Sequence, residues 1–180
     1  MDKYITKINL NLDLDSVYQD LCQERYILER CWSRLTAHPK TLFARKSPIS
    51  KGQCFVTSMH LFYKFNRYLA KKHLITIKRG FVENKHGSIL IEDHCWIEIG
   101  SKLENDRLII DLTADQSDEI SDKILISFKS LSKDLYGLRY VEQRNYNEND
   151  LYRLSFNTKI RFSLLLDEYD KYKYLIKKRA

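Results

Sequence analysis

The apolar positions of this chain follow two periods, and the segments with the longer period predict three helices. In the middle segment Phe55, Met59 and Phe62 recur at the spacing that places side chains on one helix face. The first helix also has a start signal, because the side chain of Asp15 or Ser16 can cap it. The helices are expected from Asp15 or Ser16 to about Leu35, from Cys54 to about Lys72, and from Ser155 or Asn157 to about Lys178.

Other segments alternate between apolar and polar residues, which predicts strands with one buried face. Strands are expected over residues 8–14, 74–82, 88–99, 107–113, 124–128 and 138–141, the first of which could instead be an extended arm. Between them we expect a hairpin turn at 84–87, a turn or short helix at 130–137, and loops at 36–51 and 144–150. The pattern therefore predicts an α+β fold in which a helix packs on an antiparallel sheet.

Composition favours a single folded domain. The 180 residues are 43% hydrophobic and include only five glycines and two prolines, which argues against disorder and repeats. We expect one domain over 1–180, with a strand, helix and loop at 1–50, a catalytic core at 51–142 and a helical segment at 143–180. The four cysteines lack the spacing of a disulfide framework, which indicates a reducing compartment.

The chain has a net charge of +7 and a pI near 9.1, which favours acidic partners. No stretch approaches the roughly 20 apolar residues of a membrane helix, and the first residues lack the apolar centre of a signal peptide. We therefore expect a cytoplasmic protein without a membrane span, while export by a specialised secretion route stays open. The basic C-terminal tail is interpreted as a solvated helix end rather than a nucleic-acid contact.

Three short segments contain a candidate nucleophile, a candidate base and a candidate orienting acid. Cys54 is expected at a helix N-terminus, where free N–H groups and the helix dipole favour a thiolate and can receive an oxyanion. A hairpin centred near Leu103 places His94 directly opposite Asp111. A histidine between a thiol and a carboxylate can take the thiol proton while the carboxylate fixes its tautomer.

Alternation along the strand at 88–99 assigns the neighbours of His94 to the two sheet faces. Trp96 shares the face of His94, and it either shields the three residues from water or belongs to the core. Cys95 is expected to point away from the site. The cation-rich loop at 36–51 either contacts an anionic part of the substrate or is an ordinary solvated connection.

Two glutamines near these segments are candidate oxyanion or substrate-lining residues. They are Gln53 and Gln116, although the backbone N–H of Cys54 is the safer oxyanion donor. A zinc site is the chemical alternative, and its ligands would be Cys54, His94, Cys95 and Asp111. This set lacks the closely spaced ligand pairs that are typical of zinc sites. No metal and no other cofactor is therefore expected.

These segments resemble the signatures of the transglutaminase-like superfamily of papain-like cysteine enzymes. Gly52, Gln53 and Cys54, followed by an aromatic residue, are similar to the nucleophile motif of transglutaminases. The His-x-Trp-x-Glu at 94–98 and the Asp-x-Thr at 111–113 are similar to the other two signatures. The resemblance implies a papain-like core in which a nucleophile helix packs on an antiparallel sheet.

The resemblance covers residues 52–116, about a third of the chain, and implies a catalytic triad of Cys54, His94 and Asp111. Phe55 departs from the tryptophan that follows the cysteine in eukaryotic transglutaminases. The short spacings are closer to those of small bacterial transglutaminase-like proteins and arylamine N-acetyltransferases.

The function implied is acyl transfer from an amide through a thioester intermediate. Hydrolysis is favoured because the chain is small and has no evident amine site, so the expected enzyme is a peptidase, an amidase or a protein-glutamine deamidase. Its substrate would be a peptide, a protein or a small amide, and its setting could be that of a bacterial effector or toxin. Alternatives are a transglutaminase or N-acyltransferase with an amine acceptor, and a non-catalytic basic binding module on the same fold.

Overall fold

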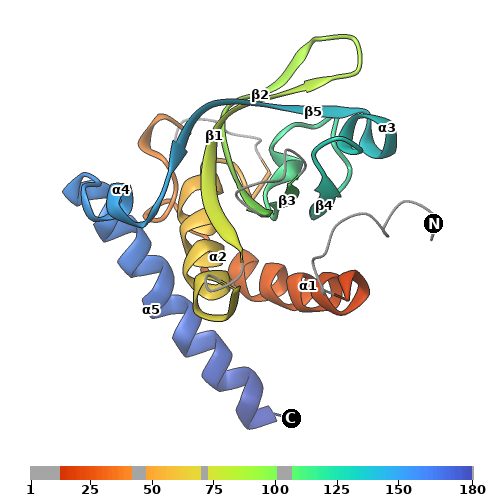
Figure 1. The fold of residues 1–180 in the computed structure, drawn as a ribbon. Coiled ribbons are helices and arrows are strands. Elements are labelled where there is room, and N and C mark those ends of the chain that lie inside the picture. Colours follow the sequence, from red (N-terminus) through yellow and green to blue (C-terminus); the bar gives the residue numbers. More distant parts are fainter. Residues whose placement is uncertain (1–12, 42–47, 70–72, 101–106, 180) are drawn as a thin grey trace.

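A five-stranded antiparallel sheet forms the centre of the fold, in the order β4-β3-β2-β1-β5 (Figure 1). The computed structural model describes residues 13–41, 48–69, 73–100 and 107–179. The strands are β1 (Leu74–Asn84), β2 (Ile89–Gly100), β3 (Leu108–Asp111), β4 (Leu125–Phe128) and β5 (Leu138–Tyr146). The helices are α1 (Leu14–Cys31), α2 (Cys54–Leu69), α3 (Ser132–Tyr136), α4 (Glu148–Tyr152) and α5 (Phe156–Arg179), with 3-10 turns η2 (Pro39–Thr41) and η3 (Ala114–Gln116). The predicted α+β class is confirmed.

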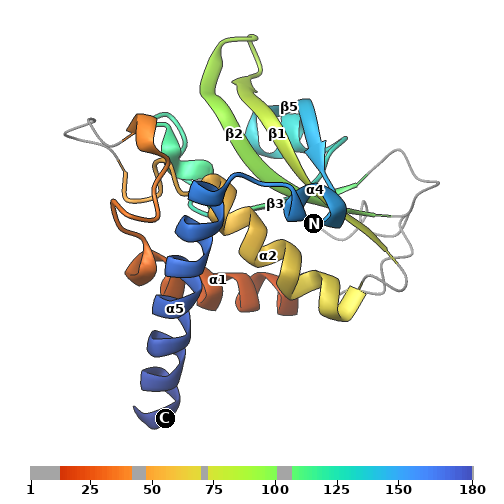
Figure 2. The same cartoon turned by 90° about the vertical axis from the view of Figure 1, so that its left-hand side faces the viewer.

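The long helices lie on one side of the sheet. Helix α2 packs on β1 and β2, and α5 packs against both α1 and α2 (Figures 1 and 2). The start of α2 therefore lies beside the first turns of α5 and beside η3 (Figure 2). The apolar cluster between helices and sheet includes Leu28, Val56, Leu61, Ile77, Ile97, Ile99 and Ile110.

A second apolar cluster covers the opposite face of the sheet. Strand residues on this face pack against the segment after β3 and against Tyr136 of α3. Its buried members include Val82, Trp96, Ile109, Leu125 and Tyr140. Both faces of the sheet are therefore covered, and β3 is accordingly an apolar run at 108–110, which is typical of strands buried on two sides.

The predicted turns and most predicted boundaries are confirmed. Gly87 closes the β1–β2 hairpin with a φ of 86°, and Gly137 ends α3 with a φ of 66°, the left-handed conformation that favours glycine. Helices α2 and α5 begin within a residue of the predicted positions. Most of the predicted strand at 8–14 lies outside the described residues, and Leu14 itself begins α1.

Two predicted boundaries are wrong for local reasons. Helix α1 ends at Cys31 rather than near Leu35, because Ser33 and Thr36 bond to each other's backbone and compete with the helix. The predicted loop at 144–150 instead contains the end of β5 and the start of α4. Its polar residues fit an edge strand, which pairs with a neighbour on one side only.

None of the helices within the described residues combines the length and the apolarity that a membrane crossing requires.

Candidate active site

Cys54 is the first residue of α2, and the tight turn that precedes it determines the position of its side chain. Gly52 has a φ of 77°, and a Cβ atom there would lie 2.2 Å from Oγ1 of Thr41. The carbonyl of Gly52 accepts a hydrogen bond from the N–H of His38 at 2.8 Å. A glycine is therefore required two residues before the cysteine, both for its conformation and for close packing. At the start of α2 the N–H of Cys54 is one of the donors without an intrahelical partner.

His94 and Asp111 form the predicted pair, but in a different register. Nε2 of His94 lies 2.5 Å from Oδ2 of Asp111, and both side chains are fully buried. Strand β2 pairs with β3 through Ile97 and Ile110, which places Asp111 opposite Trp96 rather than opposite His94. The predicted register is thus wrong by two residues. A shift of two keeps each side chain on its face, so the histidine and the aspartate meet diagonally.

Asp111 is held by three further donors. Its Oδ1 accepts from the N–H of Thr113 at 2.8 Å and from the Thr113 hydroxyl at 3.0 Å. Its Oδ2 also accepts from the hydroxyl of Tyr140 on β5 at 2.9 Å. Burial alone would raise the pKa of Asp111, but the charge of His94 and these donors hold it below its usual value. The carboxylate is therefore fixed in position and kept ionised.

Gln116 joins the nucleophile turn to the histidine. Its Oε1 accepts from the N–H of Gly52 at 3.1 Å, and its Nε2 lies 3.4 Å from Nδ1 of His94. The side chain of Gln116 also helps to lower the pKa of Cys54. This candidate therefore lies at the site, with its amide nitrogen beside the imidazole.

Cys54 and His94 each stabilise the charged form of the other. A hydrogen bond with Cys95 and the proximity of His94 outweigh burial and hold the pKa of Cys54 well below its usual value. Burial alone would lower the pKa of His94, but Asp111 and Cys54 raise it to about 10. At neutral pH these shifts favour a thiolate beside an imidazolium. Since Asp111 occupies Nε2, Nδ1 is the nitrogen left for the sulfur.

Cys95 was predicted to point away from the site, and this is wrong. It is buried, lines the same pocket as Cys54 and lies close enough to lower the pKa of Cys54. Burial and the neighbouring sulfur raise the pKa of Cys95 well above its usual value, so it stays protonated beside the thiolate. The prediction placed the nucleophile on the face of His94, whereas α2 packs on the other face, with Cys95 and Ile97.

His94 reaches the sulfur where the sheet is irregular. Gly80 pairs with His94 but Val82 with Ile91, so β2 contains an extra residue, and Asp93 has a φ of 52°. Bulges of this kind redirect side chains. The pairing of β2 with β3 ends before His94, and Gln116 contacts the histidine at this position.

Gln53 and Trp96, like His94, Asp111 and Gln116, are not among the residues that line the pocket beside the sulfur. Gln53 is buried, donates from Nε2 to the carbonyl of Ser33 at 2.9 Å and accepts from the Thr36 hydroxyl at 2.9 Å. It therefore anchors the turn rather than lining the substrate. Trp96 is fully buried and stacks near the His94 ring at 6.2 Å between centroids, so it excludes water from one side of the histidine. It too has no surface in the pocket.

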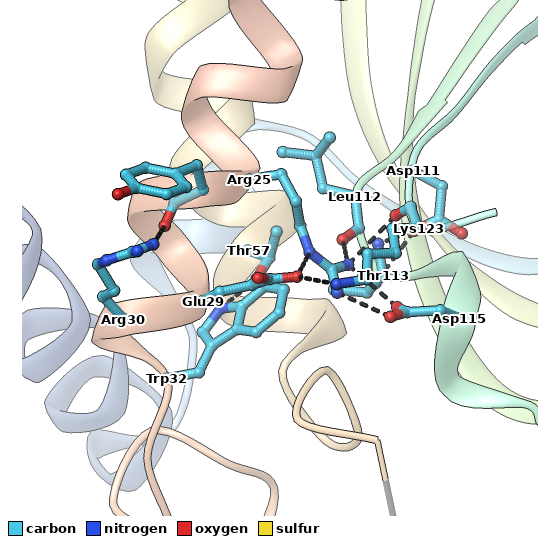
Figure 3. A network of polar contacts seen from close by, with 11 residues as sticks. Arg25, Glu29, Arg30, Trp32, Thr57, Asp111, Leu112, Thr113, Asp115 and Lys123 are labelled. Carbon is cyan, nitrogen blue, oxygen red and sulfur yellow. Dashed lines mark hydrogen bonds and ion pairs between the residues drawn. The ribbon is translucent and has the colours of Figure 1, made fainter. Parts of the chain in front are cut away.

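Arg25 of α1 fixes the segment that follows β3, as Figure 3 shows. It donates to the carbonyl of Leu112, to the carbonyl of Lys123 at 3.2 Å, and to both oxygens of Asp115 at 3.0 and 2.7 Å. The guanidinium is buried and lies 4.5 Å from the centroid of the Trp32 ring. Asp115, the second carboxylate near the base, is thus used to hold the segment that contains the site residues.

A pocket of about 120 Å³ opens onto the sulfur. Cys54, Cys95 and His38 line this pocket. Its charged lining residues are Arg79, Asp93 and Arg161. No sequence signal indicated the arginines, because Arg79 on β1 and Arg161 on α5 both lie outside the three segments. Within the described parts of the chain, no group of three or more His, Cys, Asp or Glu residues is arranged to hold a metal ion.

Comparison with known proteins identifies no relative, since no family model, curated protein or solved structure matches the chain. The chemistry of the site therefore follows from its own geometry.

Proposed function

We propose that this chain is a cysteine-dependent acyl-transfer enzyme that acts on an amide bond, with a papain-like, transglutaminase-like core. The observation that carries the proposal is the position of the His94 imidazole between the sulfur of Cys54 and the carboxylate of Asp111. A buried ion pair is costly to maintain, and buried groups with strongly shifted pKa values in a pocket are typical of catalytic sites.

In the first step the thiolate of Cys54 attacks the amide carbonyl carbon, and a C–S bond forms. The developing oxyanion is received by the backbone N–H of Cys54 and by the side-chain amide of Gln116. His94, as imidazolium, gives its proton to the leaving nitrogen as the C–N bond breaks. The products of this step are an amine and a thioester on Cys54.

In the second step water attacks the thioester, and His94 takes its proton. The C–S bond breaks, an acid is released and the thiolate returns. If the amide is a glutamine side chain, the first leaving group is ammonia and the net reaction is deamidation. An amine in place of water makes the same site a transglutaminase or N-acyltransferase. Hydrolysis is our first choice, because the one acidic side chain that lines the pocket among the described residues, Asp93, is paired with Arg79 and is not free to bind an amine.

The test is incubation with a peptide library that contains glutamine and varied amide bonds, read by mass. Hydrolysis of a peptide bond splits a peptide, deamidation adds about one mass unit and crosslinking joins two peptides, so one spectrum separates the outcomes. A stalled thioester on Cys54, released by hydroxylamine, is expected in the intact mass of the enzyme.

Cys54→Ser is the control, with a nearly unchanged side-chain volume, and we expect it to lose all of these products. The alternative of another class is a basic binding module that keeps the fold without turnover. It would bind acidic peptides equally well with and without the sulfur, and no covalent intermediate would form.

A further inference from the structure

Two arginines line the pocket beside Cys54, and only one of them has a carboxylate partner among the described residues. Arg79 is neutralised by Asp93, because its Nε and Nη2 donate to the two carboxylate oxygens, the latter at 2.8 Å. This two-point contact uses both oxygens of the only acidic side chain that lines the pocket among the described residues. Asp93 is therefore not free to serve a second cation.

Arg161, on the second turn of α5, has no such partner. Its only hydrogen bond within the described part of the chain runs from Nη2 to Oγ1 of Thr158, at 3.3 Å. Its Nε is buried without any hydrogen-bond partner, and none of the ion pairs of the described residues includes Arg161. Burial lowers the pKa of Arg161, and the charge of Cys54 only partly offsets this effect. A half-buried guanidinium with an unused donor is costly unless a ligand completes it.

The other ionisable groups near the pocket give Arg161 no described carboxylate partner. The carboxylate of Asp111 is bound to Nε2 of His94 and does not line the pocket, and the thiolate of Cys54 lies beside the imidazolium of His94. Burial, followed by the charge of Arg161, lowers the pKa of His38, so this ring is neutral near pH 7. With Arg79 and Asp93 also paired, Arg161 is the pocket-lining cation that lacks a carboxylate partner among the described residues, and it lies at the end formed by α5.

We propose that Arg161 binds a carboxylate on the acyl group of the substrate, close to the carbonyl that Cys54 attacks. The inference rests on the proposed function and adds the substrate class, namely acidic acyl donors such as a peptide with a Glu or Asp side chain next to the reacting amide. A cavity of about 120 Å³ holds about four waters, which is room for a short side chain that ends in a carboxylate. The planar fork of a guanidinium matches a carboxylate in two hydrogen bonds.

The simplest alternative is that Arg161 only supports the thiolate. Two alkylating reagents separate these roles, since iodoacetamide and iodoacetate react with a thiolate by the same displacement of iodide but differ in charge. We expect Arg161→Gln to lower the rate of Cys54 alkylation by iodoacetate about tenfold, the effect of losing one charge-assisted hydrogen bond. The rate with iodoacetamide should change less than about threefold.

Matched variants complete the test. Arg161→Lys keeps the charge and should retain most of the preference for iodoacetate, whereas exposed Arg153→Gln removes a charge elsewhere and should change neither rate. Protection of the wild-type protein gives a measurement that needs no variant. Glutarate should slow alkylation by iodoacetamide, and its neutral diamide should not.

The inference would be overturned if Arg161→Gln lowered the rate of Cys54 alkylation by the same factor with both reagents. Equal protection by glutarate and its diamide would also overturn it. These results leave the nucleophile in place. A wild-type Cys54 that reacts with iodoacetamide no faster than the other cysteines would instead refute the proposed function, and the substrate class would fall with it.

Discussion

At the scale of single residues, the charge on His94 depends on Asp111. The carboxylate lies 2.5 Å from Nε2 and raises the pKa of the imidazole, which in turn favours the thiolate. Asp111→Asn keeps the shape and can still accept from Thr113, but it removes the charge. We expect the thiolate absorbance of Cys54 near 240 nm to fall at pH 7, and its alkylation rate to fall about tenfold or more.

Tyr140→Phe is the matched control for this substitution. It removes one hydrogen bond to the same carboxylate and leaves the charge in place, so the absorbance should decrease much less. An Asp111→Asn protein whose thiolate absorbance equals that of the wild type would show that the carboxylate does not set the charge of the pair.

Gly52 and Gly87 provide a second matched comparison. Both have left-handed backbone, with φ of 77° and 86°, but only at Gly52 would a Cβ meet other atoms, at 2.2 Å from Thr41. Gly87→Ala should cost about 1 kcal/mol for conformation alone, whereas Gly52→Ala should cost at least about 2 kcal/mol. Urea unfolding measures both, and equal losses would mean that the turn before Cys54 is not tightly packed.

The sequence alone could identify residues whose side-chain type is unusual for the predicted helix or strand in which they lie. Cys54 before an apolar helix, and His94 and Asp111 on adjacent strands, are such cases, and the structure brings them together. Tyr140 and Cys95 could not be found in this way. The contact of Tyr140 depends on how β5 lies in the sheet, and the face of Cys95 depends on where α2 packs.

At the scale of elements, Glu24 of α1 joins three helices. Its buried carboxylate accepts from His60 and Lys64 of α2 and from Tyr169 of α5. Burial alone would raise the pKa of Glu24, but the hydrogen bonds from His60 and Lys64 lower it to about 2. A carboxyl group with a lowered pKa stabilises the fold above its unfolded pKa, and this contribution is lost as the pH falls toward 2.

Glu24→Gln should therefore reduce the free energy of unfolding at pH 7 by on the order of 3 kcal/mol. The difference from the wild type should shrink steadily between pH 4.5 and pH 2, as urea unfolding at several pH values would show. Exposed Glu119→Gln is the control. A difference that stays constant across this range would contradict the role given to the Glu24 carboxylate.

At this scale, the type of an element is predictable where its apolar spacing repeats over many residues, but the register between two strands is not. Helices α2 and α5 follow from their apolar spacing, whereas the pairing of β2 with β3 is shifted by two residues from the predicted one. The predicted register depends on a symmetric hairpin centred near Leu103. The polar sequence of this connection, which lies mostly outside the described residues, does not specify where the hairpin turns. The shift is an even number of residues, because a slip of one residue would exchange the side chains of two faces that pack against different clusters.

At the scale of the whole molecule, the site lies where segments distant in the chain converge. The turn before Cys54 and the β2–β3 pair position Cys54, His94 and Asp111, η3 positions Gln116, and the first turns of α5 complete the pocket. The three sequence signatures end at residue 116, so they could not indicate that Arg161 belongs to the same pocket. We therefore expect the chemistry to depend on the early segments and substrate selection to depend on α5.

The most direct test of a thiolate held by His94 is the pH dependence of Cys54 alkylation by iodoacetamide, followed by mass mapping from pH 4 to pH 10. In the native protein the rate should already be near its plateau at pH 6 to 7, because the pKa of Cys54 is well below that of a free thiol. In the urea-unfolded protein the same cysteine should titrate near the ordinary thiol pKa of about 8.5. Identical profiles in the two states would contradict the thiolate–imidazolium pair.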